Sequence, residues 1–314
     1  MTFQSIESVL ILILMMAIGF VITKQSWFGK SGENFLSKFC IRVAIPCNMV
    51  VNVSSNCETR EELLDMLKLF PVPFGIIAVF LIFGYVMSKL LRVEKKHQGT
   101  FINVMAFSNT VIVGFPIVTG LFGEPALPTA MSYYIANTVM FWSIGAWLLR
   151  RDGGQTGKLI SLNSIKKMLS LPLLGFLFGA VLVLLGIKLP QWIFSPLSQI
   201  GKTATPLAMI VTGSVLRYIN FKELKLTKDV IVLLLNRFLL SPVLLLILCI
   251  FLPFDTMTKQ VYLIMTVMPA MTQFGIVARE SGADYEFATV LIAVTTIVSM
   301  IAIPIYSIIM GFIF

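Results

Sequence analysis

Two long apolar segments of this chain are each interrupted near the middle by residues that fit a helix interior badly. The segments are Phe107–Val118, FSNTVIVGFPIV, and Val267–Ala278, VMPAMTQFGIVA. The interrupting residues of the first segment are Ser108, Asn109, Thr110, Gly114 and Pro116. Those of the second are Pro269, Thr272, Gln273 and Gly275. A proline removes a backbone hydrogen bond and clashes with the preceding turn. Ordinary proline kinks are the alternative for either segment alone, but the pair predicts two broken helices.

The composition places these segments in a membrane. Of the 314 residues, 57% are hydrophobic and only 12% are charged, and the mean hydropathy is +0.92. Soluble domains carry roughly 25% charged residues. The net charge of +9 comes from basic residues in short loops rather than from a patch, which argues against nucleic-acid binding. We therefore expect an all-α polytopic membrane protein.

The apolar pattern predicts ten transmembrane helices of about 20 residues each. Residues 1–149 form a first five-helix repeat, 150–169 a cytoplasmic linker and 170–314 a second five-helix repeat. The predicted helices are Ile6–Thr23, Phe35–Val51, Phe70–Leu91, Thr100–Phe122, Ala126–Leu149, Leu171–Leu189, Ile200–Leu216, Val230–Phe251, Val261–Glu280 and Phe287–Met310. The fourth and ninth contain the two interruptions.

Lysine and arginine predict the topology. Alternate loops are rich in these residues, and these loops begin at Lys24, Lys89, Arg150, Arg217 and Arg279. The opposite loops hold only Arg60, Lys68, Lys188 and Lys259. Basic loops stay in the cytoplasm, so both termini are predicted to be extracytoplasmic in a multi-pass protein of the cell membrane.

The two halves also resemble one another. Arg42 and Pro46 in RVAIPCNMVV recur, shifted by one common number of residues, as Lys202 and Pro206 in KTATPLAMIV. GFPIV in the first interruption matches QFGIV in the second at nearly the same shift. Because five helices turn the second copy upside down, this predicts an inverted-topology repeat.

A helix broken at mid-membrane exposes backbone N–H groups on one side and carbonyls on the other. Irregular backbone at this depth is tolerated only when it is buried in protein or lines a cavity, and paired broken helices point to a transporter's binding site. Neutral side chains that can line such a site are Asn109, Thr110, Asn137 and Gln273. A single asparagine in a membrane helix often only forms a hydrogen bond to a neighbouring helix. Together these residues predict a polar, uncharged substrate site without a metal or cofactor.

Charged residues are nearly absent from the predicted spans. No carboxylate lies near a span's middle, which disfavours a sodium/proton antiporter working through buried aspartates. Arg237 is the one deeply placed charge. It is predicted either to face an anionic substrate as a counter-charge or to bind backbone carbonyls.

The stretch NTVIVGFPI from Asn109 resembles the NTxxxGxP motif of the auxin efflux carrier family, which includes plant auxin carriers and bacterial malate and malonate permeases. MPAMTQFGIVARESGAD from Met268 is similar to the second crossover of that family. Pro46 and Pro304 also fit, and the resemblance covers essentially the whole chain.

This resemblance implies a sodium/proton-antiporter- or bile-acid-transporter-like fold that works as an elevator and forms a homodimer. Helices one, two, six and seven would form the scaffold, and helices three to five and eight to ten the moving domain. It places Asn109 near the substrate carboxylate, Asn137 as the amide of helix five, and Pro269 as the second crossover proline. The acidic residue on helix three of plant members has no counterpart here.

The leading hypothesis is a secondary transporter of small organic carboxylates, such as malate, malonate or auxin-like acids. Export could run on membrane potential, worth about 2.3 kcal/mol per charge at 100 mV, whereas import requires a co-transported proton or sodium ion. The alternative is a non-transporting sensor or receptor that binds a carboxylate in the same site, although we expect no appended signalling domain. An intramembrane enzyme is disfavoured because the sequence has one histidine, His97, and no clustered nucleophile and base.

Overall fold

The computed structural model describes residues 2–57, 59–155, 166–217, 227–251 and 254–313. Within these ranges the chain is helical and forms no strand, and its β-structure is limited to an isolated bridge between Ser108 and Ala270. Part of the predicted linker, residues 156–165, lies outside the described ranges. The helical fold expected from the sequence is confirmed for the described residues.

Several helices have the length and composition of membrane spans. In the described part of the chain, four helices are long and apolar enough to cross a bilayer, namely Gly29–Ser55, Arg60–Leu90, Lys228–Ile250 and Tyr285–Ile313. Shorter apolar helices are Leu10–Ile22, Thr110–Phe122 and Leu171–Leu184. These helices are those of a membrane protein, as the composition predicts.

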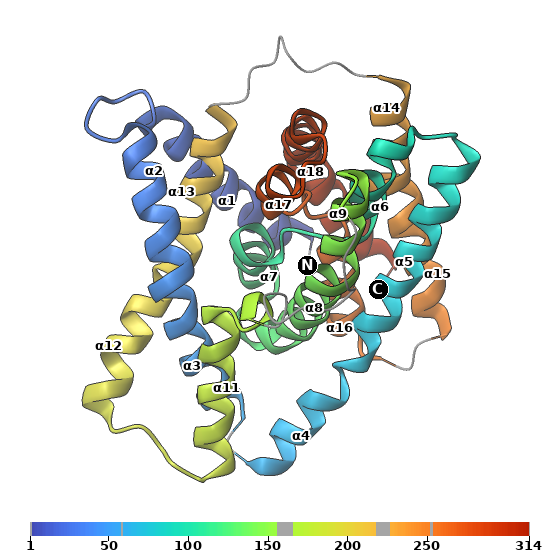
Figure 1. Ribbon diagram of the computed structural model, residues 1–314. Coiled ribbons are helices and arrows are strands. Elements are labelled where there is room, and N and C mark those ends of the chain that lie inside the picture. The colour runs from blue at the N-terminus through green and yellow to red at the C-terminus, as the bar shows by residue number, and fades with distance from the viewer. Residues whose placement is uncertain (1, 58, 156–165, 218–226, 252–253, 314) are drawn as a thin grey trace. The chain divides into compact units, whose positions relative to one another are not determined.

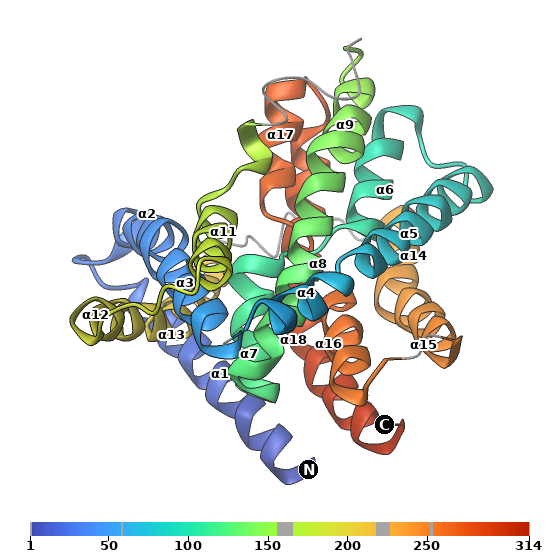
Figure 2. The same cartoon turned by 90° about the horizontal axis from the view of Figure 1, so that it is seen from below.

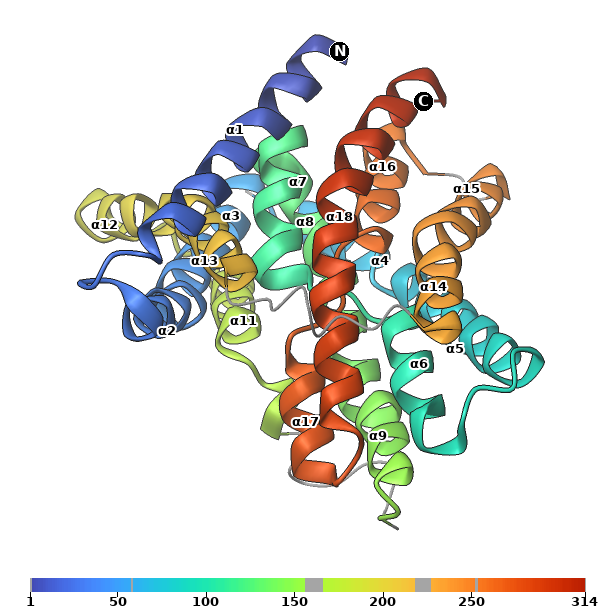
Figure 3. The same cartoon turned by 90° about the horizontal axis from the view of Figure 1, so that it is seen from above.

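The chain divides into two compact units. Unit 1 contains residues 1–70, 111–132 and 169–218. Its helices are α1 (Thr2–Ile22), α2 (Gly29–Phe39), α3 (Ile45–Asn56), α4 (Arg60–Lys68), α7 (Phe115–Phe122), the start of α8 (Leu127–Met140), α11 (Leu171–Leu184), α12 (Gln191–Lys202) and α13 (Ala204–Arg217). α1 packs along α13 and beside α7 (Figure 3), and α3 packs against α11.

Unit 2 contains residues 71–110, 133–168 and 219–314. Its helices are α5 (Pro71–Leu90), α6 (Gln98–Ala106), the end of α8, α9 (Ala146–Asp152), α14 (Lys228–Leu235), α15 (Ser241–Phe251), α16 (Thr256–Thr266), α17 (Gln273–Ser281) and α18 (Tyr285–Ile313), labelled in Figure 1. α6 packs against α5 and α9, and α17 lies beside α9 (Figure 2) and packs on α18.

One predicted span is divided in the structure, and another ends several residues early. The predicted helix Ile200–Leu216 is divided by a turn at Thr203, which separates α12 from α13. The predicted helix Leu171–Leu189 ends earlier, at Leu184, because Gly186 adopts a positive φ of 66° and turns the chain. Glycine adopts this conformation at helix ends without steric cost.

Four π-helical turns lie within longer helices of the described chain. They span Cys40–Ala44, Thr110–Gly114, Phe141–Gly145 and Asn236–Leu240. The first, second and fourth closely precede the prolines Pro46, Pro116 and Pro242. Because a proline ring crowds the carbonyl of the preceding turn, a wider π turn relieves the clash and lets the helix continue.

Close helix packing in unit 1 depends on glycine. A Cβ atom on Gly213 of α13 would lie 1.8 Å from the Met16 carbonyl oxygen, and one on Gly19 of α1 would lie 2.1 Å from that of Ile210. These distances leave no room for any side chain. Small residues that allow backbones to approach are a usual basis of helix association in lipid.

We predict that Gly213→Ala pushes α1 and α13 apart and lowers the free energy of unfolding by about 1–3 kcal/mol, the usual cost of overpacking. The measurement is the thermal unfolding temperature of purified protein in detergent. Gly75→Ala is the matched control, since a Cβ atom added to Gly75 of α5 would meet no other atom within 4 Å. Equal losses in both variants would contradict the tight contact.

Candidate functional site

The breaks in the two interrupted segments lie side by side in unit 2, at residues 107–110 and 267–272. α6 ends at Ala106, and Phe107 adopts an extended conformation with φ −110° and ψ 140°. α16 ends at Thr266, and the chain becomes helical again in α17 at Gln273. Ser108 and Ala270 form an antiparallel bridge. We call residues 107–110 together with 267–272 the crossover site.

Backbone groups of the two stretches bind one another. The Asn109 N–H donates to the Pro269 carbonyl at 2.9 Å. The Ala270 N–H donates to the Thr295 hydroxyl of α18 at 3.1 Å, and that hydroxyl donates to the Leu291 carbonyl at 2.7 Å. Groups that the helix breaks would leave unpaired are therefore satisfied by the opposite stretch and by α18, as an apolar surrounding requires.

Arg237 joins the carbonyl ends of both broken helices. Its side chain is 1% exposed and lies in the π turn between α14 and α15. The guanidinium donates to the Val104 carbonyl near the end of α6 and, at 2.6 Å, to the Met268 carbonyl after α16. It also donates to the Ser108 hydroxyl at 3.0 Å. An arginine can do this because its planar fork presents five donors in fixed directions.

The Asn137 side chain fixes the extended conformation of Ser108. Its amide oxygen accepts a hydrogen bond from the Ser108 N–H at 3.0 Å, and its amide nitrogen donates to the Ser108 carbonyl at 3.1 Å. Asn137 is fully buried. The amide thus pairs with both backbone groups of one residue, as a neighbouring strand would.

The start of α6 is held by Asp152, at the end of α9. The Asp152 carboxylate accepts hydrogen bonds from the N–H groups of Gly99 and Thr100, each at 2.9 Å. Burial raises the pKa of Asp152, and these two hydrogen bonds offset only part of that rise. With an acid at its N-terminus and Arg237 at its carbonyl end, α6 has both ends of its dipole complemented.

Two buried hydroxyl groups near the site have no hydrogen-bond partner among the described residues. They belong to Thr110 and Tyr133. The Tyr133 hydroxyl lies close to Ser108 and Arg237 but outside hydrogen-bond geometry. A buried hydroxyl without a partner costs about 1–3 kcal/mol.

The structure brings together four of the five predicted substrate-binding residues and one predicted crossover residue, Pro269. Asn109, Thr110, Asn137, Pro269 and Arg237 all belong to unit 2 and lie in or against the crossover site. Gln273, also in unit 2, is the exposed first residue of α17, and Gly275 is buried in its first turn.

The other predicted residues belong to unit 1. They are Gly114, Pro116, Pro46 and Pro206. Pro46 lies where α3 packs closely on α11, because a Cβ on Gly175 would lie 2.6 Å from the Pro46 carbonyl oxygen. Pro206 lies in the first turn of α13, directly after the turn at Thr203.

Sequence reasoning missed Thr295, Tyr133 and Asp152. Thr295 carried a usable signal, since it is a hydroxyl residue in the middle of a long apolar helix. Asp152 lies in the segment predicted to be a linker. Tyr133 could not be told from an aromatic residue that only packs in the core. Their roles depend on contacts with residues far away in the sequence.

Comparison with known proteins identifies the family of the chain. A family model described as membrane transport protein matches residues 4–307. The chain belongs to the auxin efflux carrier family of membrane transport proteins. An uncharacterized transporter of Methanothermobacter thermautotrophicus is 24% identical over 311 residues, which are 98% of each chain. An uncharacterized transporter of Methanocaldococcus jannaschii is 24% identical over 307 residues, 96% of this chain and 97% of the relative. The family predicted from the sequence is confirmed, and it is a family of transporters rather than of enzymes.

We predict that Arg237→Lys destabilises this member of the family strongly. A lysine has no fork that reaches the carbonyls of Val104 and Met268 together, so at least two charge-assisted hydrogen bonds are lost, at about 1.5 kcal/mol each. The loss of unfolding free energy should therefore be at least about 3 kcal/mol, measured by chemical denaturation in detergent. Arg42→Lys is the control, because Arg42 also lies in a π turn before a proline but is exposed. An unchanged stability of Arg237→Lys would show that the guanidinium does not hold the crossover site.

Proposed function

We propose that the protein is a secondary transporter of small organic carboxylate anions such as malate, malonate or auxin-like acids. The observation that carries the proposal is the meeting of two broken helices within unit 2, next to the start of α17. The membership of a transporter family supports it. Many transporters form their substrate site from paired helix breaks of this kind.

The local electrostatics support an anionic substrate. The first N–H groups of α17 and the positive end of its dipole favour negative charge, and Thr272 and Gln273 there are exposed. The carbonyl ends of α6 and α16 would repel an anion, but the Arg237 guanidinium neutralises them. In this proposal Arg237 acts through the crossover site, while Asn109, Thr110 and Gln273 contact the substrate.

The proposed transport cycle is an elevator with alternating access. The division of the chain into two compact units supports it. Helices three to five and eight to ten form the proposed moving domain, which carries the crossover site, and helices one, two, six and seven form the scaffold. Most residues of the moving domain belong to unit 2, whereas residues 111–132 belong to unit 1. We further propose that the chain crosses the cell membrane ten times as an inverted repeat and that it forms a homodimer. Both termini are proposed to be extracytoplasmic. No metal or organic cofactor takes part, and a proton or sodium ion is required only for import against the membrane potential.

Uptake by reconstituted liposomes tests the function. Labelled malate, malonate and indole-3-acetate are offered with and without an imposed potential, pH gradient or sodium gradient. We expect saturable uptake of at least one acid, with the effective gradient identifying the coupling. Binding of a carboxylate without any flux would instead favour a sensor or receptor.

The same assay tests the site. We predict that Asn109→Ala reduces the uptake rate at low substrate concentration by about 10- to 100-fold, as expected for a lost hydrogen bond to a charged group. Asn137→Ala should also reduce uptake, because it removes both hydrogen bonds that fix the Ser108 backbone of the site. Asn34→Ala, which changes an exposed asparagine of α2, should leave uptake unchanged. Uptake that survives in both site variants would keep the transporter but place its substrate elsewhere.

A further inference from the structure

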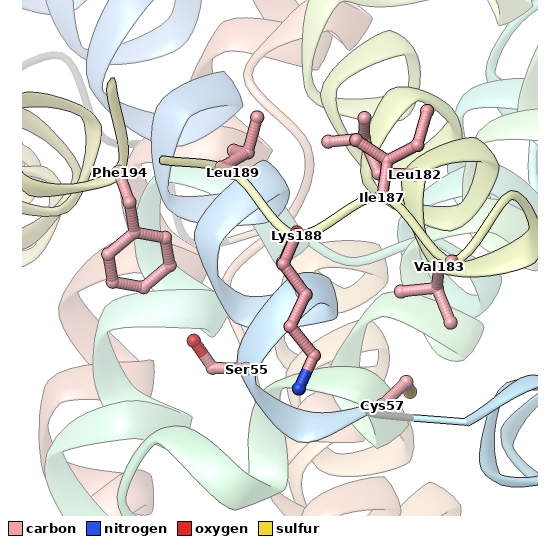
Figure 4. Close-up of a pocket in the computed structure, with 10 residues that line it drawn as sticks. Ser55, Cys57, Leu182, Val183, Ile187, Lys188, Leu189 and Phe194 are labelled. Carbon is pink, nitrogen blue, oxygen red and sulfur yellow. The ribbon is translucent and has the colours of Figure 1, made fainter. Parts of the chain in front are cut away.

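Unit 1 contains a cavity of about 230 Å³ that shares no residue with the crossover site. Its walls come from the end of α3, the end of α11 and the loop that leads to α12. They include Ser55, Cys57, Leu182, Ile187, Lys188 and Phe194, most of which Figure 4 shows. The cavity is smaller than the roughly 300–1,000 Å³ typical for drug-sized ligands. It has room for a small head group rather than for a whole large molecule.

The loop that carries Lys188 is ordered by the end of α11. The Ile187 N–H donates to the Leu182 carbonyl at 2.9 Å, and the Gly186 N–H donates to the Val183 carbonyl at 3.0 Å. With Gly186 at φ 66°, these are the two hydrogen bonds of a Schellman motif. Lys188 therefore directly follows a turn whose conformation is fixed by hydrogen bonds.

The charge of Lys188 is not compensated. Figure 4 shows its side chain extending toward Ser55 and Cys57, with the amine at that end of the cavity. Lys188 has no hydrogen bond or ion pair within the described part of the chain. Glu62 lies near Cys57, but its carboxylate accepts from the Thr59 N–H in the capping box of α4. An ammonium and a serine hydroxyl at one end of a cavity suit a phosphate.

The other walls and the surroundings are apolar. Leu182 is buried in the wall, and Ile187 and Phe194 line the cavity. On the outer surface nearby, Leu185 is 66% exposed and Trp192 is 76% exposed. Exposed leucine suits lipid chains, and tryptophan is enriched at the membrane–water interface. The amine thus lies where lipid head groups are found.

We propose that this cavity binds the phosphate of an anionic phospholipid. The phosphate contacts the Lys188 ammonium and the Ser55 hydroxyl, and the acyl chains lie along the apolar wall and the exposed side chains outside it. The site is in unit 1 and shares no residue with the crossover site.

Native mass spectrometry of the purified protein tests the proposal by counting bound lipid after titration with phosphatidylglycerol or phosphatidylcholine. We expect phosphatidylglycerol to reach a higher occupancy than phosphatidylcholine. In Lys188→Ala the affinity for phosphatidylglycerol should fall about fivefold, the usual contribution of one basic residue near anionic lipid. Lys188→Arg should keep most of the affinity. This result would show that the loss in Lys188→Ala comes from the missing charge and not from misfolding. Lys38→Ala, an equal charge change at an exposed position of α2, should have little effect.

Two results would overturn the proposal. Equal losses in Lys38→Ala and Lys188→Ala would show non-specific attraction to basic protein. Displacement of phosphatidylglycerol by inorganic phosphate at the same concentration would show a site for free anions, because the acyl chains would then contribute nothing.

Discussion

Backbone groups released by a helix break need partners wherever water is absent, and this requirement organises unit 2. α6 and α16 both end inside the protein, and each would leave carbonyls unpaired. One guanidinium, that of Arg237, binds carbonyls from both ends. The extended residues between the half-helices bind one another through Asn109 and Pro269. A break that would otherwise destabilise a membrane helix thereby becomes a fixed structure.

The supports around this structure come from several helices. Asn137 of α8 holds Ser108, Thr295 of α18 holds Ala270, and Asp152 of α9 holds the first residues of α6. Their contacts are side chain to backbone, which fixes the path of the chain rather than the position of single side chains. In the proposed function the ligand contacts Asn109, Thr110 and Gln273.

Much of the fold could be predicted from the sequence because its determinants are local. Apolar runs identify the helices, and Pro269 lies in the second break. The first break lies at residues 107–109, before Gly114 and Pro116, which belong to the helical turns that follow it. The turn at Thr203 was missed since no proline or glycine stands at that position. The partners of Arg237 could not be predicted, because the same residue in an apolar helix suits a substrate anion and a backbone carbonyl equally well. Only the positions of Val104 and Met268 in space distinguish the two.

Carboxylate binding at the crossover site is tested most directly by hydrogen–deuterium exchange. The purified protein is compared with and without the carboxylate that gives saturable uptake, and peptides covering residues 107–115 and 267–277 are followed. We predict slower exchange of amides in both peptides, including the first N–H groups of α17, when the ligand is bound. Slower exchange confined to other peptides would contradict the account and move the binding site out of the crossover.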